Sequence, residues 1–134
     1  MRILGIDWGE KRIGLAISDE NNIVALALDT IENKKASLDK IKKIINENDI
    51  GIVVIGLPLS MKGSITKKAK EVLRFAQKLK KTLNKPIYLW DERLSSKEVE
   101  KLLISANIKR EKRKKIKDKL SAVLILQSFL ERRS

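Results

Sequence analysis

The order of short apolar runs and amphipathic segments is the feature that most constrains the fold of this chain. Three apolar runs come first, over residues 2–7, 13–17 and 23–28, and the turns between them are only a few residues long. Turns this short join antiparallel strands. Two further runs, over residues 51–56 and 87–90, follow only after segments with the helical spacing of apolar residues. The pattern predicts an α/β fold, a mixed five-stranded sheet with a three-strand antiparallel meander, parallel strands and helices on both faces.

Four helices complete the predicted pattern, and the first two connect strands of the sheet. Ser95 and Glu98 have the spacing of a capping box, which predicts that a third helix begins there. The inward face of this helix is expected to contain Val99, Leu102, Leu103 and Ala106. Residues 107–115 are expected to form a polar, basic connection. The last helix is predicted over about residues 116–130, and its second half is apolar almost all round and should be buried.

The charge balance points to a polyanionic partner. Lys and Arg number 30 against 17 acidic residues, which gives a net charge of +13. On a single domain of residues 1–134, a positive field of this size favours nucleic acid as the partner. An anionic membrane fits less well, because no basic helix has an aromatic opposite face and no apolar stretch is long enough to cross a bilayer. We therefore expect no membrane partner.

The chain contains neither Cys nor His. The lack of Cys rules out disulfides and fits a cytoplasmic location. Thiol nucleophiles, Ser–His triads, His general bases and Cys/His zinc sites are excluded as well. Catalysis would therefore depend on residues such as Asp, Glu and Lys, most readily with a hard metal ion held by oxygen ligands.

Two apolar runs end directly on carboxylates. Asp7 follows the first run, and Asp91 and Glu92 follow the last. If both runs are parallel strands of one sheet, the acids emerge at the same edge, where open α/β sheets bind ligands. The glycines on either side of Asp7 would let a ligand approach the backbone, which favours metal ligation over a turn-forming role. Adjacent residues of an extended segment point to opposite faces, so only one of Asp91 and Glu92 should reach a metal. Asp91 could instead cap a helix or pair with Arg93.

A third acid, Asp118, follows the most basic stretch of the chain. This stretch contains Lys109, Arg110, Lys112, Arg113, Lys114 and Lys115. One interpretation of Asp118 is a first-turn acid that stabilises the helix dipole, and the other is a ligand for a cation. The basic stretch could be a solvated loop. Because it directly precedes a candidate acid in the sequence, we expect it to lie beside the site and hold phosphate groups.

Four segments of the chain together resemble the YqgF/RuvX family. The matching segments are Gly5–Ala16, Val54–Leu59, Trp90–Ser95 and Asp118–Leu126. They occur in order and span almost the whole chain, and the combination is far more specific than any one segment. The resemblance implies an RNase H-like fold in which Asp7, Glu92 and Asp118 form the acidic site. Trp8 is bulkier than the residue expected beside the first acid, and it would narrow the site or offer a stacking surface.

The same resemblance implies a nuclease that processes the 5′ end of precursor 16S ribosomal RNA by phosphodiester hydrolysis. Mg²⁺ or Mn²⁺ would be bound by Asp7, Glu92 and Asp118. Arg12 and Arg93 are the cations nearest in sequence to these acids and would help to neutralise the phosphate charge. The expected substrate is structured RNA or branched DNA, the ribosomal subunit is a further partner, and the chain would act as a monomer or weak dimer.

Three other functions remain open at this stage. The chain could be a Holliday-junction-type DNA endonuclease, a reading that changes only the substrate. It could also be a non-catalytic RNA-binding factor for ribosome assembly, in which the acids are structural. A phosphotransferase is the third alternative, because Asp7 and Gly9 also resemble the phosphate-binding start of actin-like ATPases and sugar kinases. A chain of 134 residues has no room for the second lobe of those enzymes.

Overall fold

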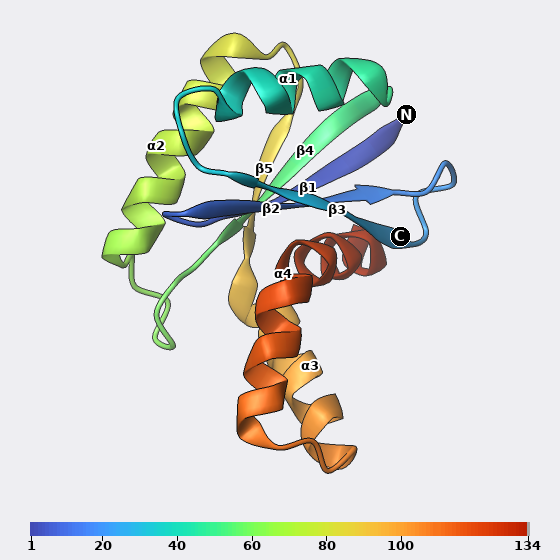
Figure 1. Cartoon of the computed structure of the whole chain (residues 1–134), viewed down its shortest axis with the longest axis vertical. Helices are drawn as coiled ribbons and strands as arrows, with labels where there is room; N and C mark the ends of the chain where they lie inside the picture. The colour runs from blue at the N-terminus through green and yellow to red at the C-terminus, as the bar shows by residue number, and fades with distance from the viewer. Residues whose placement is uncertain (134) are drawn as a thin grey trace.

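The computed structural model describes residues 1–133, except for the side chains of residues 94–100, 117 and 118. Five strands and four helices follow one another in this part of the chain (Figure 1). In chain order they are β1 (Arg2–Trp8), β2 (Arg12–Ser18), β3 (Ala25–Glu32), α1 (Ser37–Glu47), β4 (Ile50–Leu57), α2 (Lys67–Thr82), β5 (Ile87–Asp91), α3 (Glu92–Ser105) and α4 (Arg110–Arg133).

The strands form one mixed sheet in the order β3-β2-β1-β4-β5. β1 to β3 are antiparallel neighbours, whereas β4 pairs in parallel with both β1 and β5. This arrangement confirms the predicted meander followed by parallel strands. β2 and β3 lie on one side of β1, and the later strands β4 and β5 lie on its other side. The gap between β1 and β4 is therefore a topological switch point, where α/β sheets place their ligands beyond the carboxyl ends of the strands.

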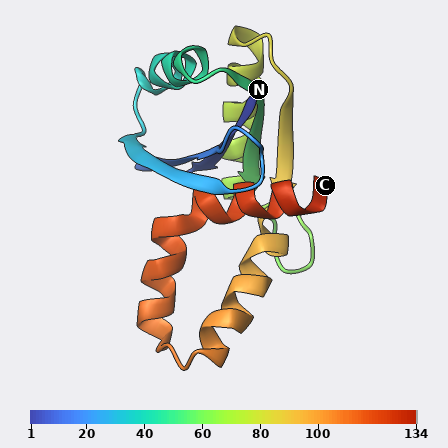
Figure 2. The ribbon, with the colours of Figure 1, turned by 90° about the vertical axis from the view of Figure 1, so that its right-hand side faces the viewer.

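Helices cover both faces of the sheet, as the sequence predicted (Figure 2). The alternation of β1 shows how the faces are divided, because Leu4 and Ile6 belong to one apolar cluster and Ile3 to the other. The first cluster is closed by α1 and α2, which contribute residues such as Ile41 and Leu79. The second cluster is closed by the C-terminal half of α4. The buried residues of this half-helix are Ala122, Ile125, Leu126, Ser128, Phe129 and Leu130.

The prediction that the third helix begins at Ser95 was wrong. β5 runs directly into α3, which begins at Glu92 with Asp91 as its N-cap, and the Asp91 carboxylate accepts the backbone N–H of Arg93 at 3.0 Å. A capping acid nearer to the strand therefore starts the helix first. The side chains of Ser95, Glu98 and Val99 lie outside the described residues.

The expected inward face of α3 was also wrong in part. Leu102 is 66% exposed and Ala106 is exposed. α3 packs mainly against α4, and the two helices form a hairpin that projects away from the sheet (Figures 1 and 2). Because the hairpin extends away from the sheet, α3 has mainly α4 against which its apolar side chains can be buried.

The basic stretch is helical and does not form the predicted connection, because α4 already begins at Arg110. Lys, Arg and Glu are good helix formers, and no Gly or Pro interrupts them before the apolar half of α4. Across the described residues 1–133, no helix combines the length and apolarity that crossing a bilayer requires.

A close approach between α4 and β1 gives a test of this packing. A Cβ atom at Gly5 would lie 2.8 Å from Leu126 Cβ and 3.2 Å from the Ala122 carbonyl oxygen. Gly5→Ala should therefore force α4 away from the sheet and lower the free energy of unfolding by about 1–3 kcal/mol in urea denaturation. Gly14→Ala is the matched control on the same face, because its Cβ would meet its nearest neighbours only at 3.6 Å, an ordinary contact distance. Equal stabilities of the two variants would contradict the packing.

Candidate functional site

Asp7 lies near the carboxyl end of β1, on the face that α4 covers. It pairs across the antiparallel ladder with Gly14 of β2. A Cβ atom at Gly14 would lie 3.6 Å both from Asp7 Cβ and from Ala122 Cβ of α4. Because Gly14 has no side chain, the space beside the Asp7 carboxylate is not filled from β2.

Glu92 reaches this face from the other side of β4. It is the first residue of α3, directly after β5. A Cβ atom at Gly56 of β4 would lie only 2.7 Å from Glu92 Oε1 and 3.0 Å from Glu92 Cγ. Gly56 belongs to β4, which lies between β1 and β5. The Glu92 side chain therefore occupies the space above β4 that a side chain at Gly56 would fill.

The carboxyl groups of Asp7 and Glu92 lie side by side. Burial, the negative charge of Asp7 and a hydrogen bond with Asp7 together raise the pKa of Glu92 to about 7. The positive charge of Lys68 in the first turn of α2 acts in the opposite direction. Two neighbouring carboxylates resist full ionisation unless a cation is present. The pair can share a proton near neutral pH or accept a cation in its place.

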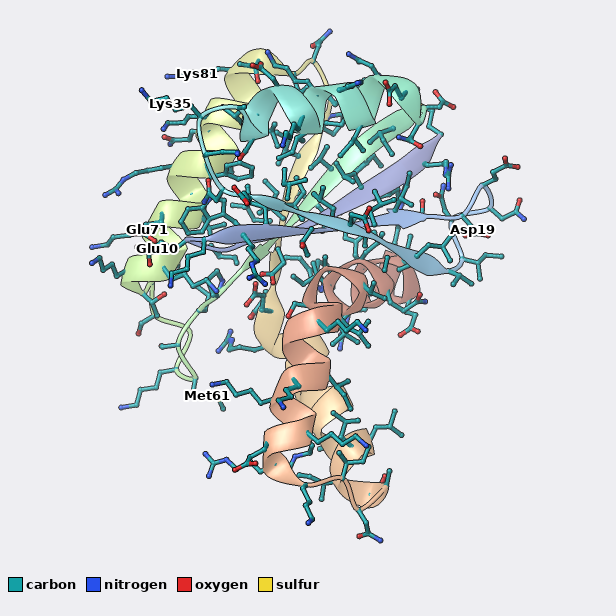
Figure 3. All side chains as sticks on the ribbon, viewed as in Figure 1. Glu10, Asp19, Lys35, Met61, Glu71 and Lys81 are labelled. Atoms are coloured by element: carbon teal, nitrogen blue, oxygen red, sulfur yellow. The ribbon has the colours of Figure 1, made fainter. Side chains whose placement is uncertain are left out.

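Asp91 has both of the structural roles that the sequence left open for it. It caps α3, and it forms a short ion pair with Arg93 in which Nη2 and Oδ2 are 2.6 Å apart. Arg93 Nη1 also donates to the Met61 carbonyl oxygen at 3.2 Å. Arg93 thus connects the loop between β4 and α2 to the start of α3. The Met61 side chain itself points outward from this loop (Figure 3).

The third predicted acid cannot be placed in the same detail. Asp118 belongs to α4, but its side chain lies outside the described residues. Among the side chains that are described, no group of three or more acids gathers as a metal site. The structure therefore brings together two of the three predicted acids, Asp7 and Glu92. Their roles as metal ligands and catalytic residues stay predictions.

The basic stretch lies in the first turns of α4, at the outer end of the helical hairpin (Figure 2). Lys109, Arg110, Lys112, Lys114 and Lys115 are exposed. Arg113 is half-buried, and its Nη1 donates to the Ile108 carbonyl oxygen at 2.8 Å. At 1.5 Å per residue, Arg110 lies about 18 Å along the helix from Ala122, which packs beside Asp7. Helix formation thus carries the stretch away from Asp7 and Glu92 at the sheet edge, whereas its last residue, Lys115, precedes Asp118 by only three positions in α4. The role of the stretch in holding phosphate groups stays a prediction.

The remaining predicted residues divide between the two faces of the sheet. Arg12 is exposed at the start of β2 and shares the face of Gly14 by strand alternation, which is the face of Asp7. Trp8 packs against the opposite apolar cluster, beneath α1 and α2, so it does not narrow the acidic site. A further acid, Asp19, directly follows β2. It accepts the backbone N–H groups of Val24 and Ile23, and these bonds lower its pKa. Asp19 therefore has a structural role in the turn between β2 and β3.

The roles of two residues of the site were not predicted from the sequence. An isolated Gly in a strand is a recognised sign of close approach, so Gly56 could have been found. Lys68 carried no such sign, because only the tertiary packing of α2 brings its charge near Glu92. Gly56 provides space for one acid, and Lys68 offsets part of its charge.

The raised pKa of Glu92 predicts a pH-dependent loss of stability in the absence of divalent cations. Between pH 4.5, the ordinary value, and about 7, the folded state binds more protons at this group than the unfolded state does. Stability should therefore fall as pH rises through this window. Glu92→Gln removes this effect. In EDTA at pH 8, its free energy of unfolding should therefore exceed that of the wild type by about 1–2 kcal/mol, with little difference near pH 4.

Urea denaturation at several pH values measures this difference. Glu47→Gln, an exposed acid on α1, serves as the control and should follow the wild-type pH dependence. If Glu92→Gln keeps the wild-type dependence between pH 4.5 and 7, Glu92 and Asp7 do not interact as described.

Comparison with solved structures supports the fold. A structure described as Thermus thermophilus RuvC in complex with a Holliday junction substrate superposes with a TM-score of 0.62 at 14% identity, covering 99% of this chain and 96% of that one. The Fowlpox virus Holliday junction resolvase superposes with a TM-score of 0.51 at 12% identity, over 98% and 99% of the two chains. At these identities, the likeness concerns the RNase H-like fold alone.

Sequence relatives match over nearly their full lengths. A protein of Thermoanaerobacter pseudethanolicus named "Putative pre-16S rRNA nuclease" is 46% identical, covering 98% of this chain and 96% of the relative. Proteins of the same name from Pelotomaculum thermopropionicum and Bacillus cereus are 45% and 43% identical, over 98% and 99% of this chain and 87% and 100% of the relatives. The family model described as "RuvX: Holliday junction resolvase" matches residues 1–132, and the chain therefore belongs to the RuvX family.

Proposed function

We propose that this chain is a nuclease that hydrolyses phosphodiester bonds in structured RNA and processes the 5′ end of precursor 16S ribosomal RNA. The observation that carries the proposal is the adjacency of Asp7 and Glu92 at the carboxyl edge of the sheet, where the pKa of Glu92 is raised to about 7. The names of relatives at 43–46% identity support the substrate. We propose further that residues 1–134 act as one nuclease domain, as a monomer or weak dimer.

The acid pair fits a divalent cation. Its donors are carboxylate oxygens, which Mg²⁺ and Mn²⁺ prefer. A half-buried carboxylate beside a second one is costly to ionise, and a cation relieves both the burial and the repulsion. We propose that Asp7, Glu92 and, from α4, Asp118 hold this ion. When bound, it supplies a Lewis acid that stabilises charge on the scissile phosphate.

The cations of the chain supply the remaining charge. Arg12 shares the sheet face of Asp7, and the charge of Lys68 acts on Glu92, so both are placed to contact phosphate oxygens close to the acids. Arg93 is already paired with Asp91 and the Met61 carbonyl group, which suits it to fixing the loop beside the site. We propose that its contribution to RNA binding is through this loop.

The basic end of α4 is proposed to hold the substrate away from the point of cleavage. Its Lys and Arg side chains gather at a helix N-terminus. They repel one another, and the partial positive charge of the helix N-terminus repels them further. A polyanion relieves that repulsion, and exposed backbone N–H groups at a helix start also bind phosphate. Because about 10–18 Å of helix separate the basic residues 110–115 from Ala122 beside Asp7, the protein would contact the RNA at two separated places.

A Holliday-junction-type DNA endonuclease is the second candidate. The family description and the fold shared with resolvases favour it. The two candidates differ in substrate and use the same acids. A third outcome, RNA binding without cleavage, would fit an assembly factor that acts with the ribosomal subunit.

The acids can be tested directly by cleavage. The wild-type protein should cut precursor 16S RNA in Mn²⁺ and not in EDTA, whereas Asp7→Asn and Glu92→Gln should each reduce the rate by at least about 100-fold, since each removes a charged ligand. A four-way DNA junction is assayed in parallel, and faster cleavage of the junction would establish the DNA alternative.

Asp19→Asn is the control for this experiment. Asp19 lies in the β2–β3 turn, whereas Asp7 lies near the β1–β2 turn, which carries Glu10 at the opposite end of the sheet (Figure 3). The Asp19→Asn substitution should therefore leave cleavage unchanged. Equal cleavage by Asp7→Asn and the wild type would exclude the proposed site. Tight binding by all variants with no cleavage would support the assembly factor.

The basic end of α4 can be tested by salt dependence. Replacing Lys112, Lys114 and Lys115 with Ser should weaken RNA binding and reduce the slope of log K against log salt by about 2–3, because each lost phosphate contact contributes about 0.7–0.9. The matched control replaces Lys40, Lys42 and Lys43 of α1, for the same change in charge. Arg113 stays in place because its guanidinium holds the Ile108 carbonyl group. Equal slopes for the two triple variants would show that α4 does not hold phosphate.

A further inference from the structure

A pocket of about 490 Å³ lies on the sheet face opposite to the acid pair. Its walls come from the end of β1, the segment between β3 and α1, and α2. Its lining includes Trp8, Lys35, Arg74, Phe75 and Lys78. Figure 3 shows Lys35 and Glu71 on this side of the molecule. The function proposed above makes no use of this pocket.

The floor of the pocket is apolar and partly aromatic. Phe75 is buried in the apolar cluster under α1 and α2, and Trp8 and Leu38 pack against that cluster without being fully covered. Trp8 is thus held in place from below while part of it stays accessible to solvent. A fixed indole with an accessible part is a suitable surface for stacking a planar group.

Hydrogen bonds fix one wall of the pocket. The Asn33 side-chain amide donates to the Gly9 carbonyl oxygen at 2.7 Å, which ties the end of β3 to the turn after Trp8. Ser37 is buried, donates through Oγ to the Glu32 carbonyl oxygen at 2.7 Å, and accepts the backbone N–H of Lys34 at 2.8 Å. The segment that carries the pocket's lysines is therefore ordered by its own bonds before any ligand arrives.

The rim of the pocket is cationic. Four of its lining residues are basic and one, Glu71, is acidic. Lys34 is partly neutralised by Glu32 at 3.2 Å, which leaves Lys35, Arg74 and Lys78 as exposed cations around an aromatic floor. A ligand complementary to this pocket has a planar apolar part and carries negative charge. A nucleotide has both properties.

We propose that this pocket binds one unpaired nucleotide of the RNA substrate, with its base on Trp8 and its phosphates on Lys35, Arg74 and Lys78. The proposal rests on the nuclease function proposed above and identifies a single-stranded segment as part of the substrate. Asp7 and Trp8 are consecutive, so the acid pair and the pocket lie on the two sides of one sheet edge. An RNA strand that passes over this edge reaches both.

The experiment uses the fluorescence of Trp8 in full-length protein. The chain has two Trp residues, and Trp90 lies on the other face of the sheet against Phe129, so Trp90→Phe leaves Trp8 as the one reporter. An eight-nucleotide RNA without self-complementarity, added in EDTA to prevent cleavage, should quench this fluorescence. Affinities of the Trp8 variants are measured by the anisotropy of the same RNA carrying a fluorescent dye. Trp8→Leu should weaken binding by about tenfold or more, because stacking on an aromatic ring is lost, whereas Trp8→Phe should retain most of the affinity.

Charge variants make the test independent of any packing defect at Trp8. Lys78→Gln should weaken RNA binding, and Lys81→Gln, one turn further along α2 and outside the pocket lining, should not. Inorganic polyphosphate is the second probe, because it carries the charge of RNA without bases. Equal quenching by polyphosphate, or equal affinities of the Phe and Leu variants for RNA, would overturn the proposal.

Asp7→Asn separates this proposal from the proposed function. In that variant the RNA should still quench Trp8, although cleavage is lost. Loss of cleavage in Asp7→Asn together with no quenching in any protein would overturn the pocket and leave the nuclease standing. Quenching together with cleavage that persists in Asp7→Asn would overturn the proposed acidic site and leave a nucleotide-binding pocket.

Discussion

The space above Gly56 is the constraint on which the rest of the site depends. β4 separates the strand that carries Asp7 from the strand that leads to Glu92, so the two carboxyl groups can meet only across it. A Cβ atom at this position would meet Glu92 Oε1 at 2.7 Å and would also collide with Ile125 of α4. A strand that is otherwise packed with β-branched residues therefore needs one glycine at this level. Its absent side chain lets Glu92 lie beside Asp7, and both the raised pKa of Glu92 and the fit to a cation follow from that placement.

Near the carboxyl ends of the strands, the two faces of the sheet carry different groups, the acid pair on one face and the cationic pocket on the other. On one face, Gly5 lets α4 pack close to the sheet near Asp7. The same helix extends outward to an end crowded with cations, which connects the acid face to a distant contact for a polyanion. On the other face, Trp8 lies in a cationic pocket beneath α1 and α2. At the end of β1, the Asp7 side chain lies on one face of the sheet and the Trp8 side chain on the other, because consecutive side chains of a strand point to opposite faces.

The sequence predicted well what depends on local pattern and poorly what depends on packing between elements. The order of strands and helices along the chain and both layers of helices followed from apolar periodicity, because each buried face must find a partner. The start of α3 was misplaced, since Asp91 caps the helix before the expected Ser95 is reached. The basic stretch was expected to be irregular, although its residues favour a helix and extend α4 to Arg110. Asp7 and Glu92 could be chosen from their positions and from family resemblance. Their contact through Gly56 and the influence of Lys68 required the tertiary structure, and the side chain of Asp118 lies outside the described residues.

Anomalous diffraction from a crystal of this chain soaked in Mn²⁺ would locate a metal ion held by Asp7 and Glu92. We expect an anomalous peak between the carboxyl groups of Asp7 and Glu92, with oxygen–metal distances of about 2.0–2.4 Å, and its loss in a Gly56→Ala crystal. A peak that contacts neither acid, or full occupancy in Gly56→Ala, would show that the acid pair does not hold the metal through the space above Gly56.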